Sequence, residues 1–337
     1  MEILGFTFNA IGPIVLLILL GYGLKRVGVL DKNFLKTANG LVFRVFLPVL
    51  LFYNVYEIDD LQVVGWGSIG YALVMIVVLF LLGMAVVHCF VPDTRQKGVI
   101  LQCVYRSNYA IIGLPLAASL GDETSVAFAA ILSAFSIPLF NVLAVIALSM
   151  YTEGEKEKVN WKHVLHNIVT NPLILAIGLG LILLAIRSFL PREEDGNLVV
   201  SIQGTLPVIY KVIQDLAKIA SPLALIVMGG LFEFQAVGRL YRQILIGTIW
   251  RTVLAPLLGI GVAILLSQTG TWIQFTQVEY PALIALFSTP VAVSSAIMAG
   301  EMNKDEQLAS QLVVWTSIAS MGTIFIIIVI MRYYGWI

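Results

Sequence analysis

The sequence predicts an all-α membrane protein in which ten transmembrane helices form two five-helix repeats of opposite orientation. The first observation is composition: 59% of the 337 residues are hydrophobic and 12% are charged, whereas about a quarter of the residues in a soluble domain are charged. The second is a series of ten apolar stretches, each long enough to cross about 30 Å of hydrocarbon. The third is a polar, proline-containing interruption in one stretch of each half.

The predicted spans are separated by clusters of charged residues. The first has no basic segment before it and no Ala-x-Ala cleavage site, so we interpret it as a retained span rather than a signal peptide. In the seventh, Lys211, Asp215 and Lys218 fall on one helical face, so its first turns are expected at the membrane interface. The ten spans cover residues 7–25, 36–56, 66–90, 98–120, 124–150, 170–190, 207–232, 241–267, 279–300 and 307–332.

Basic residues are unevenly divided between the two sides of the predicted membrane. The loops that follow the odd-numbered spans carry twelve of them, against three to five on the other side. Because cytoplasmic loops carry the excess of Lys and Arg, we expect this side in the cytoplasm and both termini outside, in the plasma membrane. The twelve are Lys25, Arg26, Lys32, Lys36, Arg95, Lys97, Lys156, Lys158, Lys162, Arg239, Arg242 and Lys304.

The polar segment Tyr151–Lys158 divides the predicted spans into five and five. Because five is odd, the second half enters the membrane from the opposite side, so any repeat is inverted. We expect a first repeat in residues 1–150, a cytoplasmic linker in 151–169 and a second repeat in 170–337. Prolines and glycines recur in matching spans: Pro13 with Pro172, Gly21 with Gly180, Pro48 with Pro222, and Pro115 with Pro290.

Two of the spans carry the polar interruptions. Asn108–Leu116 places Pro115 within the fourth span, and Phe287–Ala299 places Pro290 within the ninth. Proline lacks a backbone donor and clashes with the carbonyl four residues back, so we expect the fourth helix to open at Pro115. In a membrane, open backbone is buried in protein or lines a polar cavity, and a matched pair of broken helices indicates a transporter binding site. A packed proline kink is the alternative.

Polar side chains near the two interruptions are the candidate binding residues. Opposed half-helices direct N-terminal amides into a shared space, which favours an anion. For the serines the alternative is hydrogen bonding between helices, and Thr316, Ser317 and Ser320 of the tenth span are expected to pack rather than bind. The candidates are Arg106, Asn108, Tyr109, Gly113, Pro115, Asn141, Pro290, Ser294 and Ser295.

Three arginines lie inside predicted spans, each about ten residues or roughly 15 Å from the cytoplasmic end. They are Arg44, Arg106 and Arg251, and no acidic residue is predicted at a comparable depth. Charges inside the membrane are functional hypotheses, so one interpretation is a basic cavity that attracts an anion. The alternatives are that the side chains extend to the interface or bind carbonyl groups at a broken helix.

The sequence argues against several other classes of protein. The numbers of basic and acidic residues are equal, at 20 each, which argues against a nucleic-acid partner. His88, His163 and His166 lie near predicted loops, and Cys89 and Cys103 lack metal-ligand spacing, so no metal or other cofactor is expected. The chain has no Walker motif, which leaves an ion gradient or the membrane potential as the energy source. The coupling ion, Na⁺ or H⁺, stays open.

In their order and spacing these motifs resemble the auxin efflux carrier family of the bile acid, arsenite and riboflavin transporter superfamily. The resemblance rests on Gly21–Leu61, Asn108–Leu116, Asn171–Leu183, Ser221–Leu231 and Pro290–Asn303. It implies a scaffold of spans one, two, six and seven, usually dimeric, and a mobile domain of spans three to five and eight to ten. It also implies that spans four and nine cross at a site for a small organic anion. There, Asn108 would match the asparagine that contacts the carboxylate, and Pro115 the crossover proline.

The chain departs from the plant members of that family. Ser295 stands where they have a second crossover proline, and Pro290 lies five residues earlier, so the position of the second break is open. Residues 66–90 lack the acidic and basic pair that some plant members carry, so their coupling scheme is not transferred. The short central linker is similar to that of bacterial members, which would place the chain in a bacterial cytoplasmic membrane.

Together these features predict a secondary transporter that moves a small organic anion, auxin-like or a dicarboxylate, by elevator-type alternating access. Asn108 and the helix-end amides would hold the carboxylate, and Arg106 would add positive potential. Tyr109, Ser294 and Ser295 would shape the pocket, and the scaffold spans would form a homodimer in the lipid bilayer. A solute-binding membrane sensor and an anion channel are the alternatives. An intramembrane enzyme is disfavoured, because no paired carboxylates or Gly-x-Ser-x-Gly motif occur.

Overall fold

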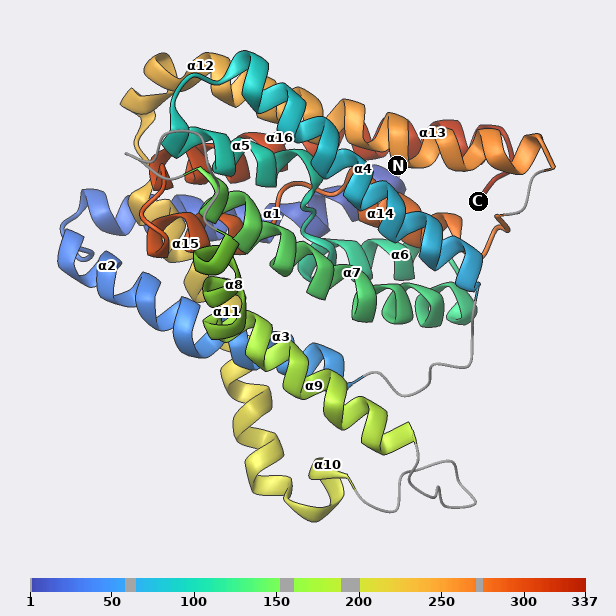
Figure 1. The fold of residues 1–337 in the computed structure, drawn as a ribbon, viewed down its shortest axis with the longest axis horizontal. Helices are drawn as coiled ribbons and strands as arrows, with labels where there is room; N and C mark the ends of the chain where they lie inside the picture. Colours follow the sequence, from blue (N-terminus) through green and yellow to red (C-terminus); the bar gives the residue numbers. More distant parts are fainter. Residues whose placement is uncertain (1, 58–64, 152–160, 189–200, 271–274) are drawn as a thin grey trace.

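Figure 1 shows the computed structural model, which describes residues 2–57, 65–151, 161–188, 201–270 and 275–337. These residues form helices joined by short connections and no β-strand, so the predicted all-α class is confirmed for them. In order, the α-helices are α1 (Glu2–Arg26), α2 (Lys32–Leu41), α3 (Leu47–Tyr56), α4 (Trp66–Phe90), α5 (Thr94–Tyr105), α6 (Leu114–Leu120), α7 (Glu123–Met150), α8 (Trp161–Thr170), α9 (Pro172–Ser188), α10 (Ile202–Thr205), α11 (Pro207–Leu231), α12 (Phe234–Ile249), α13 (Ala255–Gln268), α14 (Tyr280–Ser288), α15 (Val293–Glu301) and α16 (Glu306–Tyr333). Residues 152–160 of the predicted linker lie outside the described residues, and the part from Trp161 onward forms α8.

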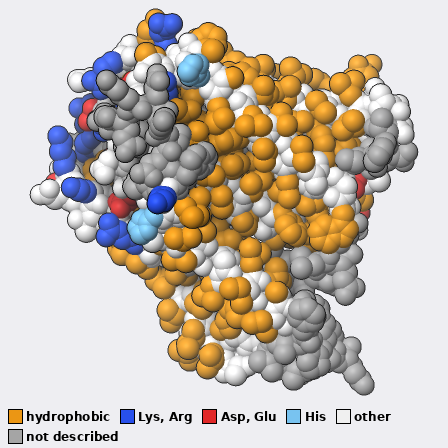
Figure 2. Space-filling model, viewed as in Figure 1, with side chains coloured by type: hydrophobic (Ala, Val, Ile, Leu, Met, Phe, Trp, Pro, Cys, Tyr) orange, Lys and Arg blue, Asp and Glu red, His pale blue; other side chains and the backbone are white. Residues whose placement is uncertain are grey.

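Six helices of the described residues are long and apolar enough to cross a membrane. They are Lys32–Tyr56, Trp66–Phe90, Glu123–Met150, Pro207–Leu231, Gln235–Gln268 and Glu306–Tyr333, and Tyr109–Leu120 and Pro172–Arg187 are shorter apolar helices. Hydrophobic side chains also cover a broad central region of the surface in Figure 2. Soluble proteins rarely expose apolar patches of such extent, so the fold is that of a protein that crosses a membrane several times.

The fourth predicted span is interrupted, although not at the predicted residue. Helix α5 ends at Tyr105, and the chain is non-helical from Arg106 to Asn108. It resumes as a π-helical turn, η2 (Tyr109–Gly113), and continues into α6, whose first turn contains Pro115. The prediction that the helix opens at Pro115 is therefore wrong. Pro115 instead follows the π-helical turn within a helix that begins at Tyr109.

The ninth predicted span is interrupted at a position that the sequence left open. Helix α14 ends at Ser288 and α15 begins at Val293. Thr289 and Ala292 have extended backbone, with ψ of 152° and 136°, and Pro290 lies between them. Ser295, the residue at the position of the plant crossover proline, lies within α15 instead of at the break.

Three π-helical turns each precede a proline by the same distance. The turns are η1 (Val42–Phe46), η2 (Tyr109–Gly113) and η3 (Trp250–Leu254), and the prolines two residues after their ends are Pro48, Pro115 and Pro256. Proline cannot donate to the carbonyl four residues back and collides with it. A π-helical turn bonds to the fifth residue back, which accommodates the proline within a continuous helix. Thus α2 and α3 form one long helix through η1, as do α12 and α13 through η3.

Helix α1 packs along α11, and α3 packs along α9 and against α11. Figure 1 shows α3, α9 and α11 together below the remaining helices. The contact between α1 and α11 is made by reciprocal glycines: a Cβ on Gly21 would collide with the carbonyl oxygen of Ile226, and one on Gly229 with that of Ile18. Small residues allow such backbone approach between membrane helices, so these glycines fix the spacing of the pair.

Gly21→Ala is expected to destabilise the protein by about 1–3 kcal/mol, because the added methyl group overpacks the contact with α11. Gly23→Ala, on the same helix, is the matched control, since nothing lies within 4 Å of a Cβ there. Thermal unfolding of both variants in detergent tests this. Equal melting temperatures for the two would show that the backbones do not touch at Gly21.

Candidate functional site

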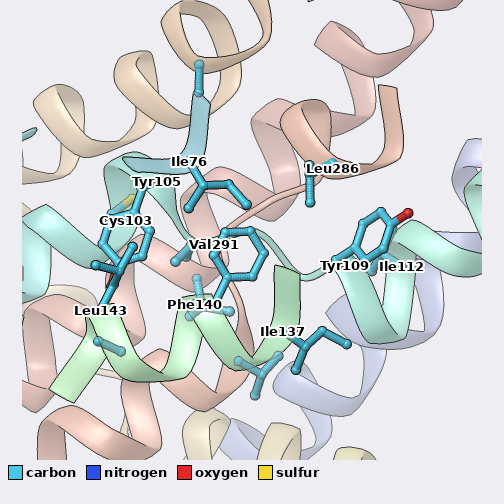
Figure 3. Packing of buried hydrophobic residues seen from close by; sticks show 14 of the residues in the cluster. Ile76, Cys103, Tyr105, Tyr109, Ile112, Ile137, Phe140, Leu143, Leu286 and Val291 are labelled. Atoms are coloured by element: carbon cyan, nitrogen blue, oxygen red, sulfur yellow. The ribbon is translucent and has the colours of Figure 1, made fainter. Parts of the chain in front are cut away.

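The two interrupted helices meet at their breaks. The backbone N–H of Asn108 donates to the carbonyl of Pro290 at 2.8 Å, and Ser107 and Val291 form an isolated antiparallel bridge. Figure 3 shows buried apolar residues around this point, among them Phe140 and Val291. The opened backbones therefore supply hydrogen-bond partners to each other in a place where water cannot.

A further hydrogen bond supports the second break from outside. The N–H of Val291 donates to Oγ1 of Thr316 in α16 at 3.2 Å, and Thr316 in turn donates to the carbonyl of Val313 at 3.4 Å. The sequence predicted Thr316 to be a packing residue, because nothing in its spacing distinguishes it from Ser317 and Ser320. Its role depends on the backbone N–H of Val291, which the break between α14 and α15 leaves without an acceptor in its own helix.

A cavity of about 50 Å³ lies beside the meeting point. Its polar wall contains Arg106, Ser107, Asn108, Asn141 and Ser294, and the side that faces α3 and α11 contains Leu47, Leu50, Leu51, Ser221 and Ala224. The site is thus bounded by both broken helices, by α7, and by helices of the group that contains α3 and α11.

First-turn residues of two helices line this cavity. Tyr109, Ala110 and Ile111 begin η2, and Val293 and Ser294 begin α15. The first amides of a helix have no acceptor within the helix, and the dipole gives this end a partial positive charge. Two helix N-termini therefore present unused donors to one small space, which is the arrangement that binds anions.

The side chain of Arg106 is buried at this site, with 2% of the residue exposed. Its guanidinium donates to Oε1 of Gln102 at 2.7 Å, Oδ1 of Asn141 at 2.9 Å and Oγ of Ser294 at 2.8 Å, and lies 3.0 Å from Sδ of Met298. No carboxylate of the described residues forms an ion pair with it. Arg106 therefore does not extend to the interface, and its charge is held by neutral groups beside the cavity.

Asn108 combines a fixed backbone with an unused side chain. Its N–H is bonded to Pro290 and the residue is 4% exposed, yet its side-chain amide has no hydrogen bond to any described residue. The amide is not among the fully buried side-chain groups that lack a partner, and the residue lines the cavity. The side chain is therefore available to a ligand.

Of the nine predicted site residues, the cavity brings together Arg106, Asn108, Tyr109, Asn141 and Ser294. The Tyr109 hydroxyl donates away from the cavity to the carbonyl of Ala129 at 3.1 Å, and Figure 3 shows its ring directed away from Phe140. Sequence analysis missed the apolar wall, because the rotation of α3 about its axis is not readable from an apolar run.

The other four predicted residues do not line the cavity. Gly113 packs under the Tyr109 ring, because a Cβ there would lie 2.6 Å from Cδ2 of that ring. Pro115 is exposed on α6, and Pro290 contributes the carbonyl that binds Asn108. Ser295 is buried in α15. Of these four residues, Pro290 thus contributes directly to the break.

The other two membrane arginines have separate structural roles. Nη2 of Arg251 donates to the carbonyls of Phe287 at 2.6 Å and Leu286 at 3.2 Å, two of the orphaned acceptors at the end of α14. Arg44 has a side chain that is 73% exposed and lies 3.4 Å from the carboxylate of Glu301. The prediction that no acidic residue lies at a comparable depth is therefore wrong for Arg44, because α15 ends beside η1 and brings Glu301 to it.

The sequence matches the model of one protein family over residues 6–328, and the description of that family is membrane transport protein. The chain belongs to the membrane transport protein family. This confirms the predicted resemblance to the auxin efflux carriers. A relative from Methanothermobacter thermautotrophicus, described as an uncharacterized transporter, is 23% identical over 325 residues, which cover 95% of this chain and 97% of the relative. As a member of this family, the chain is a membrane transporter.

Thr316→Val is expected to destabilise this transporter by about 1–3 kcal/mol, because it leaves the N–H of Val291 buried without an acceptor. Thr316→Ser keeps the hydroxyl and should unfold close to the wild-type temperature. Thermal unfolding in detergent compares the two variants. A Val variant as stable as the Ser variant would mean that the break at Thr289–Ala292 does not depend on α16.

Proposed function

We propose that this protein is a secondary transporter for a small organic anion, which it moves across the cytoplasmic membrane by elevator-type alternating access. The observation that supports this most is the convergence of two helix N-termini and the buried Arg106 on one cavity at the meeting point of the broken helices. In the low dielectric of a protein interior, such preorganised donors interact with charge more strongly than they would in solution.

Each group at the cavity has a role in this proposal. Arg106 provides the positive charge, and its neutral partners Gln102, Asn141 and Ser294 hold the guanidinium in place. The Asn108 amide donates to one carboxylate oxygen, and the first-turn amides of η2 and α15 donate to the other. In this proposal the anion supplies the counter-charge of the buried Arg106 guanidinium, and it binds through these protein groups alone.

The predicted inverted repeat is supported by one contact that occurs twice. Matching Pro48 with Pro222 makes Phe52 equivalent to Ile226, since each lies four residues after its proline. Gly21 meets the backbone of Ile226, and its predicted equivalent Gly180 lies against Phe52 and Val55. We infer that α1 with α11 and α9 with α3 are the same pair in the two halves, within a ten-span fold.

An elevator movement requires a fixed group of helices and a moving group, and the cavity lies between two such groups. In the proposal α1, α2, α3, α9 and α11 form the scaffold, through which a homodimer assembles, and the helices that carry the breaks move against it. Near one end, the two groups touch through Asn39, whose Nδ2 donates to Glu301 Oε1 at 3.2 Å, and through Arg44 and Glu301. These contacts have to break in each cycle.

The distribution of charge supports an orientation in the membrane. Figure 2 shows Lys and Arg gathered at one end of the molecule, where α2, α5 and α12 begin in Figure 1, and the chain termini lie toward the opposite end. Because basic residues favour the cytoplasmic side, we propose that the basic end faces the cytoplasm and that both termini lie outside.

Asn108→Ala is expected to abolish transport and leave the fold intact, because the side chain has no partner in the protein and the backbone bond to Pro290 is retained. The assay is counterflow of a labelled carboxylate in proteoliposomes, with thermal unfolding measured in parallel. Ser119→Ala is the control, since the Ser119 hydroxyl bonds only to the carbonyl of Leu116 in its own helix. Wild-type exchange by the Asn108 variant would remove this residue from the site, and ligand binding without any exchange by the wild type would favour a sensor.

Linking residues 39 and 301 is expected to stop transport, because it fixes the scaffold to a moving helix. The variant Asn39→Cys with Glu301→Cys is made in a Cys89→Ser background, since Cys89 is exposed and Cys103 is buried. Counterflow is measured before treatment with a short, reducible bifunctional thiol reagent, after it, and after reduction. Single-cysteine variants control for modification. Full exchange by the linked protein would exclude relative movement at this contact.

A further inference from the structure

We infer that the transported anion is a short-chain monocarboxylate, with one negative charge and a compact apolar body. This inference rests on the proposed function and decides between substrates that the sequence left open. Three properties of the cavity carry it: the number of charges in its wall, the polarity of the wall opposite Arg106, and its volume.

The cavity contains one charge to neutralise. Arg106 is the only charged residue among the described residues that line it. Arg251 is also buried, but its guanidinium is directed to the carbonyls of Leu286 and Phe287 and does not reach the cavity lining. Arg44 is outside it and pairs with Glu301. Arg106 therefore supplies one full positive charge for one carboxylate, and the two helix N-termini add only partial charges at the same end of the cavity.

Among the described residues, the wall opposite the polar groups contains no charged side chain that could pair with a second carboxylate. Leu47, Leu50 and Leu51 of α3 lie on that side, with Ile137 and Phe140 of α7 nearby. Burial of a charge without a partner is strongly unfavourable, whereas an alkyl group gains free energy there with every carbon removed from water. Ser221 is the one polar side chain on the α3 and α11 side and carries no charge. The bound acid would thus lie with its carboxylate at the crossing and its alkyl end against α3.

The volume of the cavity limits the size of the apolar part of the substrate. A cavity needs roughly 10–15 Å³ on this measure to hold one water molecule, so about 50 Å³ accommodates a few water-sized groups. Acetate and propionate have four and five non-hydrogen atoms and match this space. An indole ring, as in an auxin-like acid, is larger than this space, so we expect larger aromatic acids to bind more weakly than acetate or propionate.

The first test is competition in proteoliposomes that contain the full-length protein. Counterflow of labelled propionate is measured at pH 7.5 with unlabelled acetate, butyrate, malonate, succinate or indole-3-acetate as competitor. The short monocarboxylates are expected to compete at concentrations at least tenfold below those of the dicarboxylates and the indole acid. Stronger competition by malonate or succinate would overturn the monocarboxylate inference and leave the transporter proposal standing. Counterflow is then repeated with labelled succinate and labelled indole-3-acetate. Exchange of either acid without exchange of propionate would overturn the monocarboxylate inference alone, and exchange of none of the three would overturn both.

The second test adds a charge to the apolar wall. Leu50→Arg places a cation opposite Arg106, and we expect it to shift the ratio of propionate to succinate inhibition constants at least tenfold in favour of succinate. Leu50→Met keeps the wall apolar and should preserve the wild-type ratio. The ratio of the two inhibition constants does not depend on the amount of folded protein in the vesicles, so reduced expression of a variant does not change it. An unchanged ratio in a Leu50→Arg variant that still exchanges either acid would show that the wall does not meet the far end of the substrate.

Discussion

The hydrogen bond between the N–H of Asn108 and the carbonyl of Pro290 is the interaction on which the site depends. Two helices that open inside a membrane each expose backbone groups that hydrocarbon cannot satisfy. Here the exposed edges pair with each other, and Thr316 accepts the N–H of Val291 that would otherwise be left over. Because those groups are satisfied, the amides that stay unused are the first-turn donors at the cavity, where a ligand can reach them.

The same broken helices explain why two buried arginines behave differently. Arg251 meets the carbonyl end of α14, where the helix dipole is negative and supplies a partial counter-charge. Arg106 reaches Ser294 at the amide end of α15, where the dipole adds to the positive potential. A helix break always creates one end of each kind. Arg251 binds the carbonyls of α14 through Nη2, and its Nε and Nη1 have no hydrogen-bond partner among the described residues. Arg106 lies at the amide end, beside the cavity that a solute anion can enter.

The sequence was sufficient for the fold class and for the existence of both breaks, because apolar length and a polar, proline-bearing interruption are local patterns. It misplaced the first break, since a π-helical turn allows Pro115 to stay within a helix and no pattern for such a turn was recognised. It also left out Leu47, Leu50 and Leu51. Each face of a membrane helix is apolar, so the residues that face the cavity are decided by packing between distant segments, and the same holds for Thr316.

The π-helical turn η1 has a consequence for the cavity wall. A π turn holds one more residue than an α turn, so everything after it is rotated by about 100° relative to an uninterrupted helix. Leu47, Leu50 and Leu51 follow η1 directly and owe their direction to it. The side chains that form this wall are therefore determined by the rotation of α3 about its axis as well as by the sequence of α3. In a homologue that lacks the extra residue, a different set of α3 side chains would meet the solute.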